Sequence, residues 1–387
     1  MIPKHTNPSE TPFVSIGIFA WNEERAISAM LASLFQQSLF ERLCRRGLAC
    51  EVICVTNGCT DRTASVAEEV FAQQRHKHSW AEGFAGRVAA IQERGKVNAW
   101  NRFVHEFSVR QAKYLFMMDA DILIHRPETL WNMVQSLEQN PAASVAVDRP
   151  RKDIFFKQQR SWRDWFSLRI SEVTLAASAQ LCAQLYCIRA EVARGLYLPK
   201  DLPACEDGFI KSLVCTDNLA HETLPERICL APEAEHTFEA YTSPAAILRN
   251  QKRQVIGQTI VHLLVDKNLR QLPGFQRRQL AQTLRARDAT DPDWLKRLIS
   301  QHLQRTRWFW RLYPGLFEYR LTRLRGLNPL KQIICLPAAC ASCCATLLAS
   351  LLAYRTLKSG SIHYWPKERR LGLGGVHSAD LRLRPMN

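Results

Sequence analysis

Short apolar runs alternate with stretches of helical periodicity along the first half of the chain. Residues 13–20, 51–56, 87–91 and 113–118 are runs of strand length, and the residues between them repeat apolar positions at the helical period. Strands that alternate with helices are joined by right-handed crossovers into a mainly parallel sheet. We therefore predict an α/β fold whose ligands bind beyond the carboxyl ends of the strands.

Polar residues at the ends of two of these runs predict where helices begin. Asn22 is a candidate N-cap, with Glu23 and Glu24 in the first turn, where the helix dipole favours acids. Asp61 is a candidate cap for the next helix. Both capping residues follow a predicted strand, so they lie at the edge of the sheet where ligands are expected.

The pattern changes after residue 240. Segments 242–267, 274–287 and 291–305 have the periodicity and charge of basic amphipathic helices. Aromatic residues and arginines are interleaved over 307–331, and Trp, Tyr and Arg prefer the headgroup level of a bilayer. We predict an interfacial segment there, and a core helix with a basic outer face is the alternative.

An uncharged, largely apolar run follows over 333–354, between Lys331 and Arg355. Its length fits a membrane-spanning or re-entrant helix, and a buried core helix is the alternative. The predicted organisation is therefore a catalytic domain over 1–240, a basic and aromatic helical region over 241–331, a transmembrane or re-entrant helix over 332–355 and a flexible tail over 356–387.

Composition adds a strong positive charge to this picture. The formal net charge is +16 and the sequence pI is about 9.5, which suggests a polyanionic partner: nucleic acid, an anionic membrane surface or phosphorylated substrates. The 13 cysteines show no regular spacing of pairs, which is typical of a reduced compartment. The N-terminus has no apolar stretch of the signal-peptide type, so no signal peptide is expected.

The sharpest chemical feature is the pair Asp119 and Asp121 at the end of a predicted strand. Two carboxylates at this spacing in a loop can face one ligand and hold Mg²⁺ or Mn²⁺, which bind hard oxygen donors. Such a metal neutralises the charge that develops on a diphosphate leaving group. A pair of solvated loop acids is the alternative interpretation.

Two further features lie at predicted helix starts. Glu206 and Asp207 begin a helix after Pro203, where acids either cap the helix or supply the general base of an inverting transfer. Gly95 and Lys96 lie at a strand-to-helix junction, where a lysine and helix N–H groups suit a pyrophosphate. An ordinary surface lysine is the alternative for Lys96.

Six blocks in fixed order resemble family 2 glycosyltransferases of the GT-A fold: SIGIFAWNEERAI, EVICVTNGCTDRT, RGKVNAWN, YLFMMDAD, QLYCIRAE and CEDGFI. The resemblance covers residues 1–215. It implies a GT-A domain that transfers a sugar from a nucleotide-sugar donor with the help of a divalent metal. Six ordered blocks are far more specific than any one of them.

The resemblance also implies roles for single residues. Asp119 and Asp121 form the metal- and donor-binding pair, with Asp121 favoured as the direct metal ligand. Asp207 is the counterpart of the catalytic base, and Glu206 precedes it. The donor-binding residues implied are Asn22, Glu23, Asn57, Asp61, Lys96 and Asp119.

Three positions depart from the family pattern. Asn57 replaces an acid that meets the base in many members; its amide oxygen still accepts from a uracil N–H, but without charge, so a UDP-sugar is favoured less strongly. Gln184 and Leu185 stand where many relatives have glycine. Segment 251–255 lacks the tryptophan of the Q-x-x-R-W motif of processive synthases, which argues against a polymer-extruding enzyme.

The leading hypothesis is a metal-dependent, inverting, hexosyltransferase-like enzyme of cell-surface glycan or glycolipid biosynthesis. It would be membrane-associated, with the catalytic domain on the cytoplasmic side, a glycan or lipid-linked acceptor and no nucleic-acid partner. The alternatives are a nucleotidyltransferase of similar fold, which usually opens with a Gly-rich basic loop, and a non-enzymatic basic membrane-binding protein. The segment after the first strand, AWNEE, is acidic and lacks glycine.

Overall fold

A seven-stranded sheet forms the centre of the computed structural model, which describes residues 12–77, 84–157, 161, 164, 180–203, 205–241, 243–306, 308–316 and 329–360. The strands are β1 (Pro12–Ala20), β2 (Ala49–Asn57), β3 (Phe84–Ile91), β4 (Tyr114–Asp119), β5 (Val145–Lys152), β6 (Leu185–Arg189) and β7 (Ile228–Phe238). Their order is β3-β2-β1-β4-β6-β5-β7. Only β6 runs antiparallel to its neighbours, so the prediction of a mainly parallel sheet is confirmed.

The continuous apolar runs arise because both faces of the sheet are covered. Along β4, Phe116 and Met118 enter one buried cluster, while Leu115 and Met117 enter a second cluster on the opposite face. Successive strand residues point to opposite faces, so a strand that is buried on both sides is apolar throughout.

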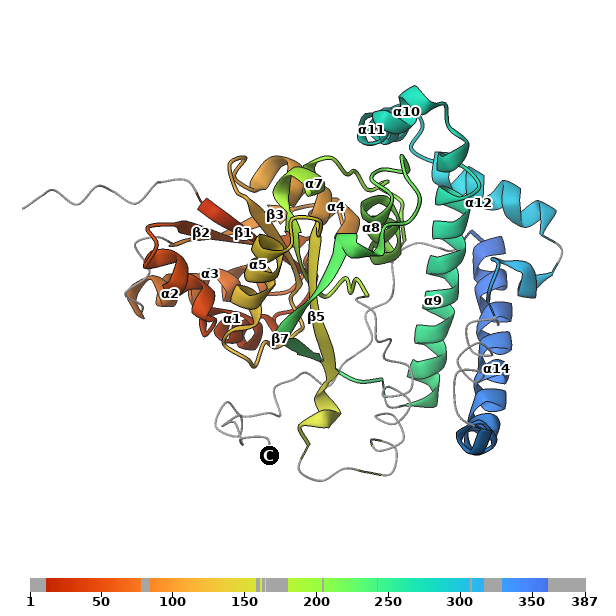
Figure 1. Ribbon diagram of the computed structural model, residues 1–387, viewed down its shortest axis with the longest axis horizontal. Coiled ribbons are helices and arrows are strands. Elements are labelled where there is room, and N and C mark those ends of the chain that lie inside the picture. The colour runs from red at the N-terminus through yellow and green to blue at the C-terminus, as the bar shows by residue number, and fades with distance from the viewer. Residues whose placement is uncertain are drawn as a thin grey trace, which may run out of the picture.

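Helices cover both faces of the sheet (Figure 1). One face packs against α1 (Ile27–Phe35), α2 (Ser38–Cys44), α3 (Thr63–Lys77) and α5 (Thr129–Gln139). The other packs against α4 (Lys96–Arg102), α7 (Ala190–Arg194), α8 (Glu206–Cys215) and the π-helical turn Phe103–Phe107. This arrangement is the mixed α/β, GT-A-like fold predicted from the sequence.

The C-terminal helices extend the second cluster outward. They are α9 (Pro244–Val265), α10 (Gly274–Arg278), α11 (Leu280–Thr290), α12 (Trp294–Arg305) and α14 (Pro329–Lys358). Ile260 of α9, Leu284 of α11, Ile299 of α12 and Ala353 of α14 belong to the same buried cluster as Ile188 of β6. In Figure 1, α9 lies beside α8, and α14 runs along the outer side of α9. The sheet and the helical region therefore share one continuous core.

Helices form over the three segments after residue 240 for which basic amphipathic helices were predicted, with one break at Gln279 between α10 and α11. Of α9, α11 and α12, only α12 has a clearly amphipathic pattern. Helix α14 contains the whole uncharged run 333–354. Within the described residues, the helices include none whose length and apolar character suffice to cross a membrane. Of the predicted interfacial segment, residues 308–316 and 329–331 are described, and the predicted tail lies outside the described residues beyond Gly360.

The prediction that Asn22 caps the first helix is wrong. Helix α1 begins at Ile27 with Ala26 as its N-cap, and its first turn contains no acid. Asn22 instead has a φ of 54°, the left-handed conformation that asparagine tolerates better than most residues. The backbone N–H of Glu23 donates to Thr63 Oγ1 at 2.7 Å, which ties this segment to the next loop. Glu23 O accepts from the backbone N–H groups of Ala26 and Ile27, so a turn that starts at Glu23 leads into α1.

Candidate active site

The ammonium group of Lys96 lies at the centre of the candidate site. Lys96 begins α4, and its Nζ is 2.5 Å from Asp119 Oδ1 at the end of β4 and 3.2 Å from Glu206 Oε1 at the start of α8. It also donates to the carbonyl oxygen of Ala183 at 2.9 Å. One lysine thus joins the two acidic pairs that the sequence places 87 residues apart, from Asp119 to Glu206.

Burial and the charged groups of this site shift the pKa values of its two neighbouring acids, Glu206 and Asp207, in opposite directions. Burial alone would lower the pKa of Lys96, but Asp119 and Glu206 raise it, so the lysine is charged. Burial acts to raise the pKa of Glu206, yet Lys96 and Arg253 outweigh it and hold that pKa below its ordinary value. Burial, followed by the charge of Glu206, raises the pKa of Asp207. The pKa of Glu206 is therefore lowered, whereas the pKa of its neighbour Asp207 is raised.

Asp119 and Asp121 offer oxygen donors that fit a hard divalent cation. Burial first, and then the charge of Asp121, raise the pKa of Asp119 even though Lys96 opposes them. A cation beside both carboxylates would relieve this repulsion. Mg²⁺ is usually held by one or two carboxylates, with its other positions filled by phosphate oxygens and water, so the donor set suits Mg²⁺ or the similar Mn²⁺. Among the described residues, no cluster of three or more His, Cys, Asp or Glu side chains forms a larger cage.

Hydrogen bonds tie together the loops that follow β1 and β2. Asn22 Oδ1 accepts from the backbone N–H of Thr60 at 2.7 Å. Asp61 Oδ1 accepts from the backbone N–H of Thr63, the first residue of α3, at 3.0 Å, although Asp61 lies one residue before the N-cap position that was predicted for it. Together with the contact from Glu23 to Thr63, these bonds make one rigid rim from the two loops.

Asn57 lies beneath this rim and is 3% exposed. Its Nδ2 donates to the carbonyl oxygen of Ala20 at 2.8 Å, and its Oδ1 accepts from the backbone N–H of Gly95 at 3.0 Å. The amide therefore holds three loops in register. Its oxygen already accepts one hydrogen bond inside the protein, which leaves a single lone pair for a nucleotide base.

Arg253 of α9 is a site residue that the sequence reasoning did not select. Its charge lowers the pKa of both Glu206 and Asp207. The available signal was the partial match to Q-x-x-R-W at Gln251, which the missing tryptophan led us to treat only as an argument against a processive enzyme. The helical region thus supplies positive charge to the acids at the start of α8.

The sequence reasoning also missed a buried histidine–aspartate pair behind the site. His236 Nδ1 of β7 is 2.7 Å from Asp148 Oδ2 of β5, and neither side chain is exposed. His236 Nε2 lies 3.3 Å from Gln184 Oε1, and the backbone N–H of Asp119 donates to Gln184 O at 2.9 Å. No local sequence pattern predicts these contacts, because Asp148, Gln184 and His236 come together only when β5, β6 and β7 pair in the folded sheet.

Comparison with known proteins gives a family match over the part of the chain that carries most of this site. Residues 15–181 match the model of glycosyl transferase family 2. That range includes the rim loops, Lys96, Asp119 and Asp121, but ends before Glu206 and Asp207. A comparison with curated proteins gives no match.

Several solved structures are similar to this chain. The mannosyltransferase PcManGT from Pyrobaculum calidifontis, in complex with GDP-Man and Mn²⁺, is 17% identical over 91% of this chain and 88% of its own, with a TM-score of 0.50. TarS residues 1–349 from S. aureus is 14% identical over 90% of each chain, with a TM-score of 0.41. Glucosyl-3-phosphoglycerate synthase from Mycobacterium tuberculosis, with Mn²⁺ and UDP-Glc, is 14% identical over 67% of this chain and 84% of its own, with a TM-score of 0.42.

The likeness to PcManGT concerns the fold, and the family match covers residues 15–181. Three observations agree with that match: the order of the sequence blocks, the GT-A-like sheet and the acids at its carboxyl edge. Residues 15–181 of this chain are thus similar to glycosyl transferase family 2.

Proposed function

We propose that the protein is an inverting glycosyltransferase that moves a sugar from a nucleotide-sugar donor to a hydroxyl group of an acceptor. The observation that carries the proposal is the Lys96 cluster, in which the acid pair after β4 and the acid pair opening α8 meet at one lysine. A donor-binding acid pair and a candidate base have to lie close together, because the transferred sugar lies between the diphosphate and the acceptor hydroxyl that the base deprotonates. The match to family 2 supports the same class of reaction.

The nucleotide-sugar donor is proposed to bind between the metal pair and the tied rim loops. Asp119 and Asp121 would hold Mg²⁺ or Mn²⁺, and the metal would supply Lewis-acid stabilisation of a diphosphate leaving group. The tied rim would form the walls of the proposed nucleotide site and so limit the motion of a bound donor. Besides the metal pair, the residues proposed to contact the donor are Asn22, Glu23, Asn57, Asp61 and Lys96.

Asp207 is proposed as the general base. Its raised pKa makes it a better proton acceptor than an ordinary aspartate, while Lys96 holds Glu206 as a charged neighbour. When Asp207 takes the proton of the acceptor hydroxyl, the oxygen attacks the sugar carbon opposite the leaving diphosphate. A single displacement of this kind inverts the configuration at that carbon.

The proposal also covers the nucleotide of the donor and the class of the acceptor. A UDP-sugar is proposed as the donor, although structural neighbours include complexes with GDP-Man as well as UDP-Glc. The acceptor is proposed to be a glycan or a lipid-linked intermediate of cell-surface glycan or glycolipid synthesis.

A donor screen tests this proposal. We expect purified protein with Mg²⁺ or Mn²⁺ to be protected against melting by one class of nucleotide sugar and to hydrolyse it slowly. Binding at 100 times the dissociation constant would stabilise the fold by about 2.7 kcal/mol, which a melting curve detects readily. Protection by nucleoside triphosphates, with no response to any nucleotide sugar, would favour a nucleotidyltransferase.

We further propose that the protein is membrane-associated, with the catalytic domain on the cytoplasmic side, where nucleotide sugars are made. Support comes from exposed apolar side chains in the C-terminal region: Trp308 and Trp310, stacked at 4.7 Å between ring centroids, and Leu336, Leu347 and Leu348 of α14. Aromatic rings of this kind prefer the membrane–water interface.

Substitution of exposed residues tests this attachment without disturbing the core. We expect wild-type protein in the membrane fraction, and Trp308→Ser/Leu348→Ser to shift largely to the soluble fraction. Each substitution removes about 1.5–3 kcal/mol of apolar burial in the bilayer. Phe275→Ser on α10 is the control, because it removes an aromatic side chain that is 61% exposed. Wild-type protein that stays in solution without detergent would contradict the proposal.

A further inference from the structure

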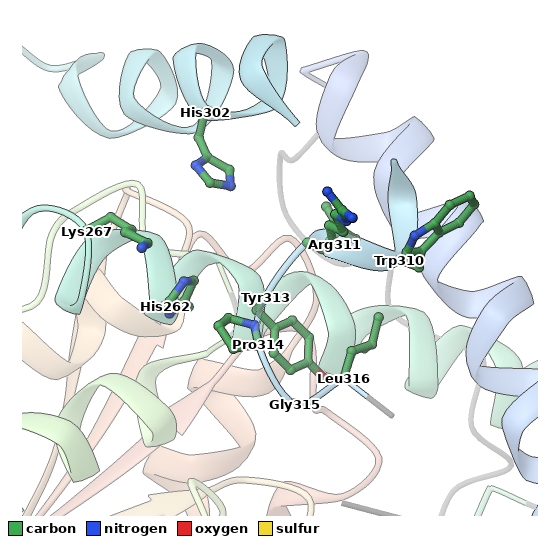
Figure 2. Close-up of a pocket in the computed structure, with 10 residues that line it drawn as sticks. His262, Lys267, His302, Trp310, Arg311, Tyr313, Pro314, Gly315 and Leu316 are labelled. Atoms are coloured by element: carbon green, nitrogen blue, oxygen red, sulfur yellow. The ribbon is translucent and has the colours of Figure 1, made fainter. Parts of the chain in front are cut away.

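A cavity of about 500 Å³ lies in the helical region, away from the Lys96 cluster. Its walls come from the end of α9, from α12 and from segment 308–316. In Figure 2, His302 points from α12 toward the end of α9, where His262 and Lys267 lie, and Arg311 projects from segment 308–316. This volume is within the range of small-molecule sites, which is about 300–1,000 Å³.

The wall supplied by segment 308–316 is held firmly in place. Leu312 and Leu316 are 1% and 6% exposed and belong to the main core. The hydroxyl of Tyr313 donates to Gln258 Oε1 on α9. The cavity is thus built by anchored residues and does not depend on a loose surface loop.

The charge around the cavity is positive. Lys267 and Arg311 line it, and neither forms an ion pair with any acid in the described part of the chain. Asp266, which precedes Lys267 in the sequence, interacts with His262 Nδ1 at 2.8 Å and accepts from Arg270 Nε at 3.2 Å. Two cationic groups therefore face this space without an opposing charge.

His302 adds a polar group that lacks a partner. Its Nε2 is buried and makes no hydrogen bond within the described structure. Burial, followed by the charges of His262, Lys267 and Arg305, lowers the pKa of His302. A buried polar atom without a partner costs about 1–3 kcal/mol, and a ligand oxygen in the cavity would remove that cost.

We propose that this cavity binds a phosphate ester, separately from the donor site. Arg311 matches phosphate oxygens with its planar fork, Lys267 adds a point charge, and His302 Nε2 supplies a neutral hydrogen bond. Because the cavity is much larger than a phosphate group, the ligand carries an organic part. The side chains of Pro314 and Leu316, which also line the cavity, supply an apolar surface for that part. Two sources share this chemistry: a lipid headgroup and a soluble phosphate ester.

Direct binding measurements test the proposal without using transferase activity, so a failure of the proposed reaction would leave them unaffected. The probes are glycerol 3-phosphate in solution, vesicles that contain phosphatidic acid, and vesicles that contain oleate at the same surface charge. The test variant is Lys267→Gln/Arg311→Gln. The control variant, Arg278→Gln/Arg285→Gln, also removes two exposed positive charges from the helical region, but outside the cavity. Melting curves confirm that both variants fold.

We expect the test variant to bind the phosphate probe about tenfold or more weakly than wild type, since two charge-assisted contacts are lost. The control variant should bind as wild type does. Cavity-dependent binding of glycerol 3-phosphate but not of phosphatidic acid vesicles identifies a soluble ester as the source, and cavity-dependent binding of the vesicles identifies a lipid headgroup. Equal weakening in test and control variants, or equal binding to oleate vesicles, would overturn the proposal by showing non-specific attraction to negative charge.

Discussion

Sugar transfer by Asp121→Ala is expected to fall by about 10³-fold or more, to the limit of detection. Asp121 and Asp119 are the proposed metal ligands at and just after the end of β4, so the substitution would remove one of the two carboxylates. The Lewis-acid stabilisation of a leaving diphosphate contributes several kcal/mol, and each 1.36 kcal/mol is tenfold in rate. The metal-dependent part of donor binding should disappear with the activity, as measured by calorimetry with and without Mn²⁺.

Folding should survive this substitution, because Asp121 lies in a turn and is partly exposed. Asp201→Ala is a matched control: it removes another partly exposed aspartate, whose ion pair with Lys296 at 2.9 Å lies outside the site. Such a pair contributes about 0–1 kcal/mol. Full activity of Asp121→Ala, or of wild-type protein in EDTA, would reject the metal assignment.

The Asp207→Asn variant should lose about 10²-fold or more of its transfer rate while its donor affinity stays nearly unchanged. Asparagine keeps the size of the side chain, and it still accepts the hydrogen bond that Asp207 Oδ1 receives from the backbone N–H of Gly208 at 2.8 Å. It cannot take a proton from the acceptor. A role limited to the helix start predicts the opposite outcome, with a lower melting temperature and a near-normal rate.

The dependence of the rate on pH provides a second measure of the same role. A base must be deprotonated, so the wild-type rate should fall as the pH drops through the pKa of Asp207. Burial and Glu206 raise that pKa above its ordinary 3.8, so the fall should begin at a higher pH than for a free aspartate. The residual rate of Asp207→Asn should lack this acid limb.

Glu206→Gln controls for the loss of one negative charge at the start of α8. Lys96 and Arg253 keep the pKa of Glu206 low, so Glu206 is a poor proton acceptor. We expect this variant to weaken the Lys96 cluster and the stability of the fold, while the acid limb of Asp207 remains. A near-normal rate in Asp207→Asn would remove Asp207 from the mechanism and bring Glu206, or a retaining reaction, into consideration.

Much of this architecture could be predicted from local pattern. The strand that ends at Asp119 is apolar because both its faces are buried, and the helix that opens at Glu206 follows a proline and carries acids in its first turn. Such signals depend on a few neighbouring residues, so one sequence is enough to detect them.

The rest depends on contacts between distant residues. The sequence could suggest Lys96 as a phosphate ligand, but not that its ammonium joins Asp119 and Glu206. Asn22 was predicted to cap a helix because asparagine is a good N-cap residue, but asparagine is also favoured in left-handed loop positions such as the one that it occupies here. Arg253 could not be assigned, because only the packing of α9 beside α8 brings it close to the acids.

The core shared by the sheet and the C-terminal helices has a consequence for how this protein could have evolved. Ile260, Leu264 and Leu284 pack in the same cluster as the buried side of α8, so a chain cut at residue 240 would expose an apolar face. The helices are thus not an independent module that recombination could exchange among sugar-transferring enzymes. Substitutions on the buried side of this helical layer would therefore also disturb the packing beneath α8.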